Sequence, residues 1–134
     1  MILWQIYKME NLREIRNELL SLHKTLMDIE RSNHEAEFGK VTNLQLLNLL
    51  FENERFIWLR DISGIVAEID ELFASKSGLN YELGNQLYIK VNSLFDQSGE
   101  NELFKSKYQA NLDTENTVSE HHQKIINLIK KERA

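Results

Sequence analysis

The stretch Phe56–Phe73, FIWLRDISGIVAEIDELF, decides the fold of this chain. Two rows of apolar side chains cross it at helical spacing, and together they form a face wider than the single stripe of a surface helix. The rows are Trp58, Ile62, Ile65, Ile69 and Leu72, and Leu59, Ile62, Val66, Ile69 and Phe73. The remaining side carries Ser63, Gly64 and Ala67, small residues that would let another helix approach closely. We therefore predict a central helix over residues 54–76 that is buried on most of its circumference.

The composition is that of an ordinary globular protein, with 42% hydrophobic and 28% charged residues among 134. The absence of proline and the presence of only five glycines favour long helices joined by short links. Because cysteine is absent, disulfides, thiolate nucleophiles and cysteine-based zinc sites are excluded. The net charge of −5 argues against nucleic-acid binding, and no apolar run approaches the ~20 residues that span a membrane. We expect one cytoplasmic domain, residues 1–134, that binds neither nucleic acid nor membrane.

The strongest periodic signal lies in the first part of the chain. Its heptad has Leu12, Leu19 and Leu26 at a, and Ile15, Leu22 and Ile29 at d. This pattern predicts a long helix from Met9 to Phe38, ended by a glycine cap at Gly39. Residues 1–8 are apolar without polar alternation. They are either an extended leader before a start at Met9 or an extra helical turn that docks onto a partner subunit.

Capping residues mark the helices that follow. Thr42 and Gln45 form a capping box that opens a short helix, and this helix is apolar nearly all round, so we expect it to be buried. Asn53 is the expected cap of the central helix. The expected starts of the later helices are Asn80, which opens a helix ending at 98–99, Asn101, which opens a weaker helix to Leu112, and a capping box at Thr117 and Glu120. The sequence thus predicts an all-α, single-domain helical bundle of five to six helices.

Polar side chains on apolar helix faces are the candidate site residues. His23, Glu30 and His34 share one face of the first helix, and His122 occupies a core-facing position of the last helix. A metal site built from them lacks motif support, because no histidine has a glutamate three residues before it and His-Glu-x-x-His is absent. Hydrogen-bonded packing histidines are the simpler interpretation.

Arg60 and Asp70 are the most unusual charges, because they stand on an otherwise apolar central helix. If they are buried they must pair, and Arg60 is the natural partner for a carboxylate on a facing helix. The alternative is a small polar pocket that recognises an anion through Arg60. No Gly-rich phosphate loop, Gly-x-Ser-x-Gly elbow or nucleophile with a base is present. This favours a non-enzymatic role and leaves catalysis open.

Several short runs between residues 22 and 71 occur together. They are Leu22-His23-Lys24, Asp28 with Glu30-Arg31, Phe56-x-Trp58-Leu59-Arg60-x-x-Ser63 and Ile69-Asp70-Glu71. The set resembles an uncharacterised family of small bacterial all-helical proteins, and the resemblance covers the first helix through the central helix. It implies a bacterial, cytosolic and helical protein, and it brings neither an activity nor site residues.

Two hypotheses about function follow from the sequence. The first is a non-enzymatic protein-interaction or regulatory module that binds a protein partner or a second copy of itself. The heptad helix, the apolar leader and the absence of catalytic motifs favour it. The second is a bundle that binds a small molecule or metal at a polar site beside the central helix. Its candidate residues are Arg60, Asp70, His23, Glu30 and His122, and no cofactor is implied.

Overall fold

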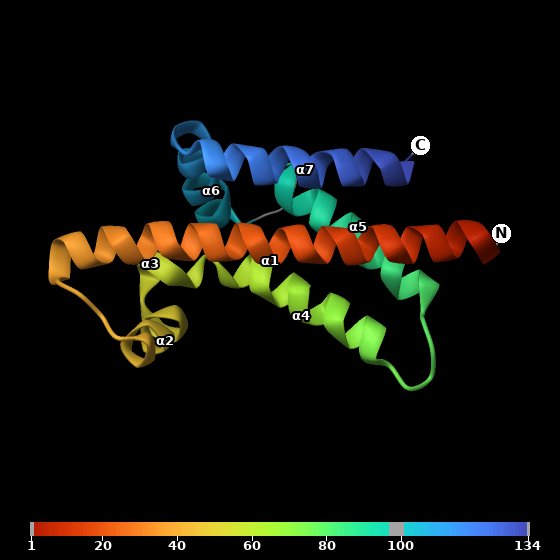
Figure 1. The fold of residues 1–134 in the computed structure, drawn as a ribbon, viewed down its shortest axis with the longest axis horizontal. Coiled ribbons are helices and arrows are strands. Elements are labelled where there is room, and N and C mark those ends of the chain that lie inside the picture. The colour runs from red at the N-terminus through yellow and green to blue at the C-terminus, as the bar shows by residue number, and fades with distance from the viewer. Residues whose placement is uncertain (1, 97–100, 134) are drawn as a thin grey trace.

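The computed structural model describes residues 2–96 and 101–133, and within these ranges the chain is all-α, with seven helices and no strand (Figure 1). The helices are α1 (Ile2–Phe38), α2 (Asn43–Glu52), α3 (Glu54–Ile57), α4 (Arg60–Ala74), α5 (Tyr81–Phe95), α6 (Glu102–Thr114) and α7 (Asn116–Arg133). The predicted all-α class is therefore confirmed. The predicted number of helices, five to six, was too low because the central helix is divided into α3 and α4.

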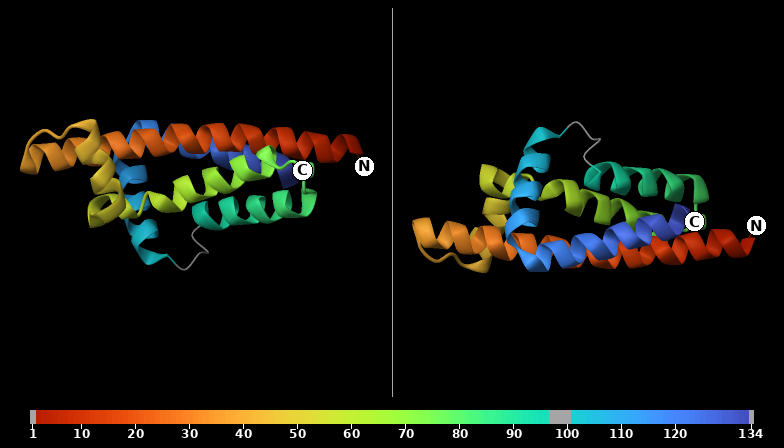
Figure 2. Two further views of the ribbon diagram at one scale, coloured as in Figure 1. Left: turned by 90° about the horizontal axis from the view of Figure 1, so that it is seen from below. Right: turned by 90° about the horizontal axis from the view of Figure 1, so that it is seen from above.

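The long helix α1 is the axis around which the other helices pack. Its most extensive contacts are with α7 and then with α4. Figures 1 and 2 show α7 running antiparallel along one side of α1, and α4 and α5 lying on another side. The short helix α6 crosses between the end of α5 and the start of α7, while α2 and α3 lie near the C-terminal end of α1. Both chain ends are at the same end of the molecule.

The heptad of α1 forms the seam on which these helices meet. Its apolar side chains are fully buried, apart from Ile29, which is partly buried against the same core. The helix ends at Phe38, as predicted, because Gly39 adopts a φ of 93° that suits glycine. Residues 2–8 continue the helix, and the Tyr88 hydroxyl of α5 donates a 2.8 Å hydrogen bond to the Lys8 carbonyl.

The capping box at the start of α2 is formed as predicted. The Gln45 backbone N–H donates to the Thr42 hydroxyl at 3.1 Å, and the Thr42 backbone N–H donates to the Gln45 side chain at 2.8 Å. The expectation that α2 is buried was wrong, because Leu46 is its only buried residue. Local capping therefore defines this helix while much of its surface stays open to solvent.

Replacing Thr42 with alanine is expected to lower the free energy of unfolding by about 1 kcal/mol, because the Gln45 backbone N–H loses the hydroxyl that accepts its hydrogen bond. Amide hydrogen exchange over residues 43–48 and chemical denaturation would measure the effect. Thr117→Ala is the matched control. The predicted capping box at Thr117 was wrong, since α7 begins at Asn116 and Thr117 lies inside it. Equal losses in both variants would contradict this assignment.

The central helix is interrupted at Trp58 and Leu59. Here the Leu59 N–H bonds to the Phe56 carbonyl at 3.0 Å and the Ile62 N–H bonds to the Leu59 carbonyl at 3.1 Å, a three-residue spacing that tightens the backbone. Asn53 caps α3, where its side chain accepts from the Arg55 N–H, and so it does not cap the long helix that was predicted. The apolar rows of α4 are buried as expected, with Phe73 partly exposed.

The small residues of α4 face solvent. Ser63, Gly64 and Ala67 are all exposed, and a Cβ added to Gly64 would meet nothing within 4 Å. The prediction that they admit a closely packed helix was therefore wrong. Helix α4 therefore has one buried face, on the side where α1 and the other helices lie, and one face that is open to solvent.

The later helices begin where their caps predicted. The Asn80 side chain accepts from the Leu83 N–H at 3.0 Å, and the Asn101 side chain accepts from the Phe104 N–H at 3.1 Å. The helix that follows Asn80 ends at Phe95. Its predicted end at 98–99 lies outside the described residues.

Candidate functional site

Arg60 and Asp70 do not pair with each other, and both are exposed. The Arg60 guanidinium donates to the Phe51 carbonyl of α2 and lies 5.6 Å from the centre of the Phe51 ring. Asp70 forms a two-point ion pair with Arg16 of α1, with N–O distances of 2.8 and 3.1 Å. These charges therefore join neighbouring elements at the surface.

Glu30 and His34 are brought together in the core. They lie one turn apart on α1 and are only 5% and 8% exposed. Glu30 Oε2 and His34 Nδ1 are buried atoms without a hydrogen-bond partner, and Arg55 Nη1 is a third. The His34 ring lies between Phe38 and Phe56, with centroid distances of 4.9 and 5.9 Å. This is a polar cluster enclosed by aromatic packing.

Burial raises the pKa of Glu30, and this effect outweighs Lys107, the Trp58 indole and Arg55, which all favour the charged carboxylate. His23 belongs to the same predicted row and is half-buried, and burial lowers its pKa. Of the three residues predicted to share this face of α1, Glu30 and His34 are buried and His23 is half-buried. Burial disfavours the charged form of each group. It therefore raises the pKa of Glu30, which is charged when deprotonated, and lowers the pKa of His23, which is charged when protonated.

His122 lies in a second polar contact, between α6 and α7. Its Nδ1 is 2.8 Å from the Tyr108 hydroxyl, and its ring packs against Phe95 with centroids 5.7 Å apart. Burial lowers the pKa of His122 and raises that of Tyr108. The neighbouring His121 points elsewhere, toward Glu18 at 3.3 Å. His122 is therefore separate from the Glu30–His34 cluster.

Acidification is expected to destabilise the fold through His122. Because its pKa is lowered in the folded state, the unfolded chain takes up the proton first, and stability is lost as pH falls below the ordinary histidine value. His122→Asn keeps a polar group near Tyr108 and removes this titration. Denaturant unfolding at several pH values should show a shallower fall of stability with falling pH for His122→Asn than for the wild type. An unchanged slope would contradict the assignment.

A group of exposed apolar side chains lies on α2, a feature that the sequence did not reveal. Leu44, Leu47 and Phe51 are 70%, 48% and 62% exposed. Their spacing of three and four residues places them on one helix face, which we call the outer stripe. Leu46, Leu49 and Leu50 are the inward residues of the same helix, packed into or against the core. The all-round apolar character of α2 thus reflects two faces, only one of which this chain covers.

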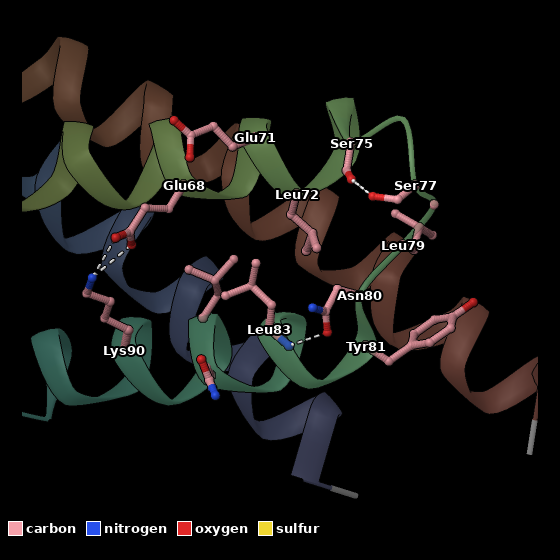
Figure 3. Close-up of a pocket in the computed structure, with 13 residues that line it drawn as sticks. Glu68, Glu71, Leu72, Ser75, Ser77, Leu79, Asn80, Tyr81, Leu83 and Lys90 are labelled. Atoms are coloured by element: carbon pink, nitrogen blue, oxygen red, sulfur yellow. Dashed lines mark hydrogen bonds and ion pairs between the residues drawn. The ribbon is translucent and has the colours of Figure 1, made fainter.

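A cavity of about 850 Å³ lies between α4, α5 and the loop that joins them (Figure 3). Leu72 of α4 and Leu83 of α5 project into the space between the two helices, and Glu68 and Lys90 close one side with N–O distances of 2.8 Å. The cavity lies beside the central helix, where the second hypothesis expected a site. None of the predicted site residues lines it.

The described residues contain no group of three or more His, Cys, Asp or Glu side chains that could hold a metal ion. Within the same ranges, no helix is both long enough and apolar enough to cross a membrane. Comparisons with protein-family models, with curated proteins and with solved structures find no match.

Proposed function

We propose that this protein is an interaction module that self-associates through the outer stripe of α2. The observation that carries the proposal is the exposure of Leu44, Leu47 and Phe51 on one face of a well-capped helix. Single exposed apolar residues are common on protein surfaces, whereas adjacent ones on one face are typical of interaction sites. The proposed role is non-enzymatic.

A second copy of the chain is a chemically suitable partner for this face. In an antiparallel pair of α2 helices related by a two-fold axis, Leu44 of one copy would face Phe51 of the other, and the two Leu47 side chains would meet near the axis. The same arrangement brings Glu52, at the C-terminal end of α2, close to the partially positive N-terminus of the opposite α2. The proposed pairing therefore matches apolar side chains with apolar side chains and places a carboxylate near each α2 N-terminus.

The short length of the stripe sets the strength of this association. A helix of ten residues is about 15 Å long, which is too short for a standard-sized interface. We therefore propose a weak dimer in reversible exchange with the monomer. Such an interface suits a regulatory contact, in which a small change in concentration alters the fraction of dimer.

Leu47→Asp is expected to abolish the dimer, because it places two like charges near the two-fold axis and removes the central apolar contact. Sedimentation equilibrium over a wide concentration range would measure association. Ile89→Asp is the matched control, since Ile89 of α5 is also an exposed apolar residue, 66% exposed, and is far from the stripe in sequence. The wild type and the control should associate alike. A wild type that stays monomeric, or equal weakening of both variants, would overturn the proposal.

Two further expectations accompany this proposal. The resemblance to an uncharacterised bacterial family supports a small helical protein without an established chemistry, and the composition favours a cytoplasmic location. Both stay predictions from the sequence. Localisation of a tagged chain by cell fractionation would test the second of them.

A further inference from the structure

We infer that the cavity between α4 and α5 is a binding site for small organic cations that carry an apolar body. Its volume of about 850 Å³ lies within the range of roughly 300–1,000 Å³ common for ligand sites. This site is distinct from the outer stripe of α2, and it does not depend on self-association.

The apolar part of the ligand would rest on leucine side chains. Leu72 and Leu87 are buried at the base of the cavity, whereas Leu79 and Leu83 line it and are partly open to solvent. Figure 3 shows Leu72 and Leu83 converging from the two helices. A ligand that covers Leu79 and Leu83 would remove their apolar surface from water, which is favourable.

The charges of the cavity favour a cation over an anion. Two carboxylates, Glu68 and Glu71, and one ammonium, Lys90, line it. The Lys90 ammonium is held by both oxygens of Glu68, each at 2.8 Å. Glu71 is exposed and, among the described residues, has no ion-pair partner. Figure 3 shows the Glu71 carboxylate on the side of α4 that faces away from α5, so an ammonium group would pair with it at the outer edge of the cavity without displacing an existing contact.

Neutral polar groups at the rim are partly engaged by hydrogen bonds within the chain. The Ser75 and Ser77 hydroxyls lie 3.1 Å apart in a mutual hydrogen bond, and the Asn80 side-chain oxygen accepts from the Leu83 N–H. An anionic ligand would thus meet an ammonium that is already paired with Glu68, together with an excess of negative charge. Its binding would be opposed by like-charge repulsion.

Three probes of similar shape test the inference: phenylbutylamine, phenylbutanol and phenylbutyrate. Each is titrated into the full chain and followed by two-dimensional NMR of the backbone amides. The amine should bind about three-fold more tightly than the alcohol, as expected for one exposed ion pair, and the carboxylate should bind most weakly. The perturbed amides should lie in residues 68–90. Equal affinities, or shifts centred elsewhere, would overturn the inference.

Two variants then separate the charge from the fold. Glu71→Gln should reduce amine binding about three-fold, to the level of the alcohol, and leave alcohol binding unchanged. Lys90→Gln frees Glu68 and should strengthen amine binding, a gain that misfolding cannot produce. Glu120→Gln, on the exposed surface of α7, is the control, because it changes the net charge by the same amount as Glu71→Gln. Failure of either response, or an equal response in the control, overturns the inference.

Discussion

Replacing Trp58 with alanine is expected to lower the free energy of unfolding by about 3–5 kcal/mol, the largest effect of any prediction made for this chain. The side chain is fully buried at the junction of α3 and α4. Its ring lies 5.7 Å from Phe104 of α6, and its indole N–H donates to the Arg55 carbonyl at 3.0 Å. Removing it would leave a cavity between helices that otherwise have little direct contact.

Chemical denaturation followed by far-UV circular dichroism measures this loss, because helix content reports on the whole fold. Phe51→Ala is the matched control, since Phe51 is also aromatic and close in sequence but lies exposed on α2. Its cost should stay within about 0.5–1 kcal/mol. Trp58→Phe should fall between the two, because it keeps a ring and loses the hydrogen bond. A cost for Trp58→Ala similar to that for Phe51→Ala would contradict the assigned role.

The features that sequence predicted well depend on local rules. The heptad from Leu12 to Ile29 could be recognised from helical periodicity alone. The helix end at Gly39 could be recognised because glycine tolerates a positive φ. The caps at Thr42 and Asn80 depend on hydrogen bonds within three residues of the chain. Such interactions are already specified by neighbouring residues, so they can be recognised before the tertiary structure is known.

The features that sequence missed depend on contacts between distant segments. Trp58 and Leu59 are adjacent and both buried, and the tight turn between α3 and α4 accommodates them in a core to which α1 and, through Phe104, α6 contribute. Hydrophobicity alone could not tell whether the second face of α2 is covered by this chain or left open. The fold class was therefore predictable, while the division of the central helix and the exposed stripe were not.

The candidate site was predictable only in part, for the same reason. The spacing of Glu30 and His34 required that they share a face, and the structure places both in the core. Arg60 and Asp70 were singled out by contrast with their apolar neighbours, but helical geometry directs them outward, and Asp70 meets Arg16 instead. The cavity between α4 and α5 has no sequence motif, because it is formed by two helices and a loop.

Replacing Glu30 with glutamine is expected to stabilise the protein by about 1–2 kcal/mol above neutral pH, because the variant keeps the side-chain shape and removes a buried charge. Glu30 is almost completely buried, and one carboxylate oxygen has no hydrogen-bond partner. Lys107 and Arg55 favour the charged carboxylate, but they only partly offset the cost of burial. Burial therefore raises the pKa of the carboxyl group.

The direction of the pKa shift of Glu30 determines how the stability gain of Glu30→Gln changes with pH. Because the pKa of Glu30 is raised in the folded state, the folded protein holds the proton more tightly than the unfolded chain does. Stability is then lost as pH rises from the ordinary carboxyl value through the raised one. The advantage of Glu30→Gln should therefore vanish in acid, where the wild-type carboxyl is neutral in both states.

Denaturant unfolding of wild type and Glu30→Gln across this pH range would measure the difference. Glu120→Gln removes an exposed carboxylate and should show a difference within about 0.5 kcal/mol at every pH. If Glu30→Gln instead destabilises the fold above neutral pH, then attraction to Lys107 and Arg55 outweighs desolvation, and Glu30 is a charge that the fold requires. A stabilised variant means that the core carries Glu30 at a net cost, which packing around α1 must offset.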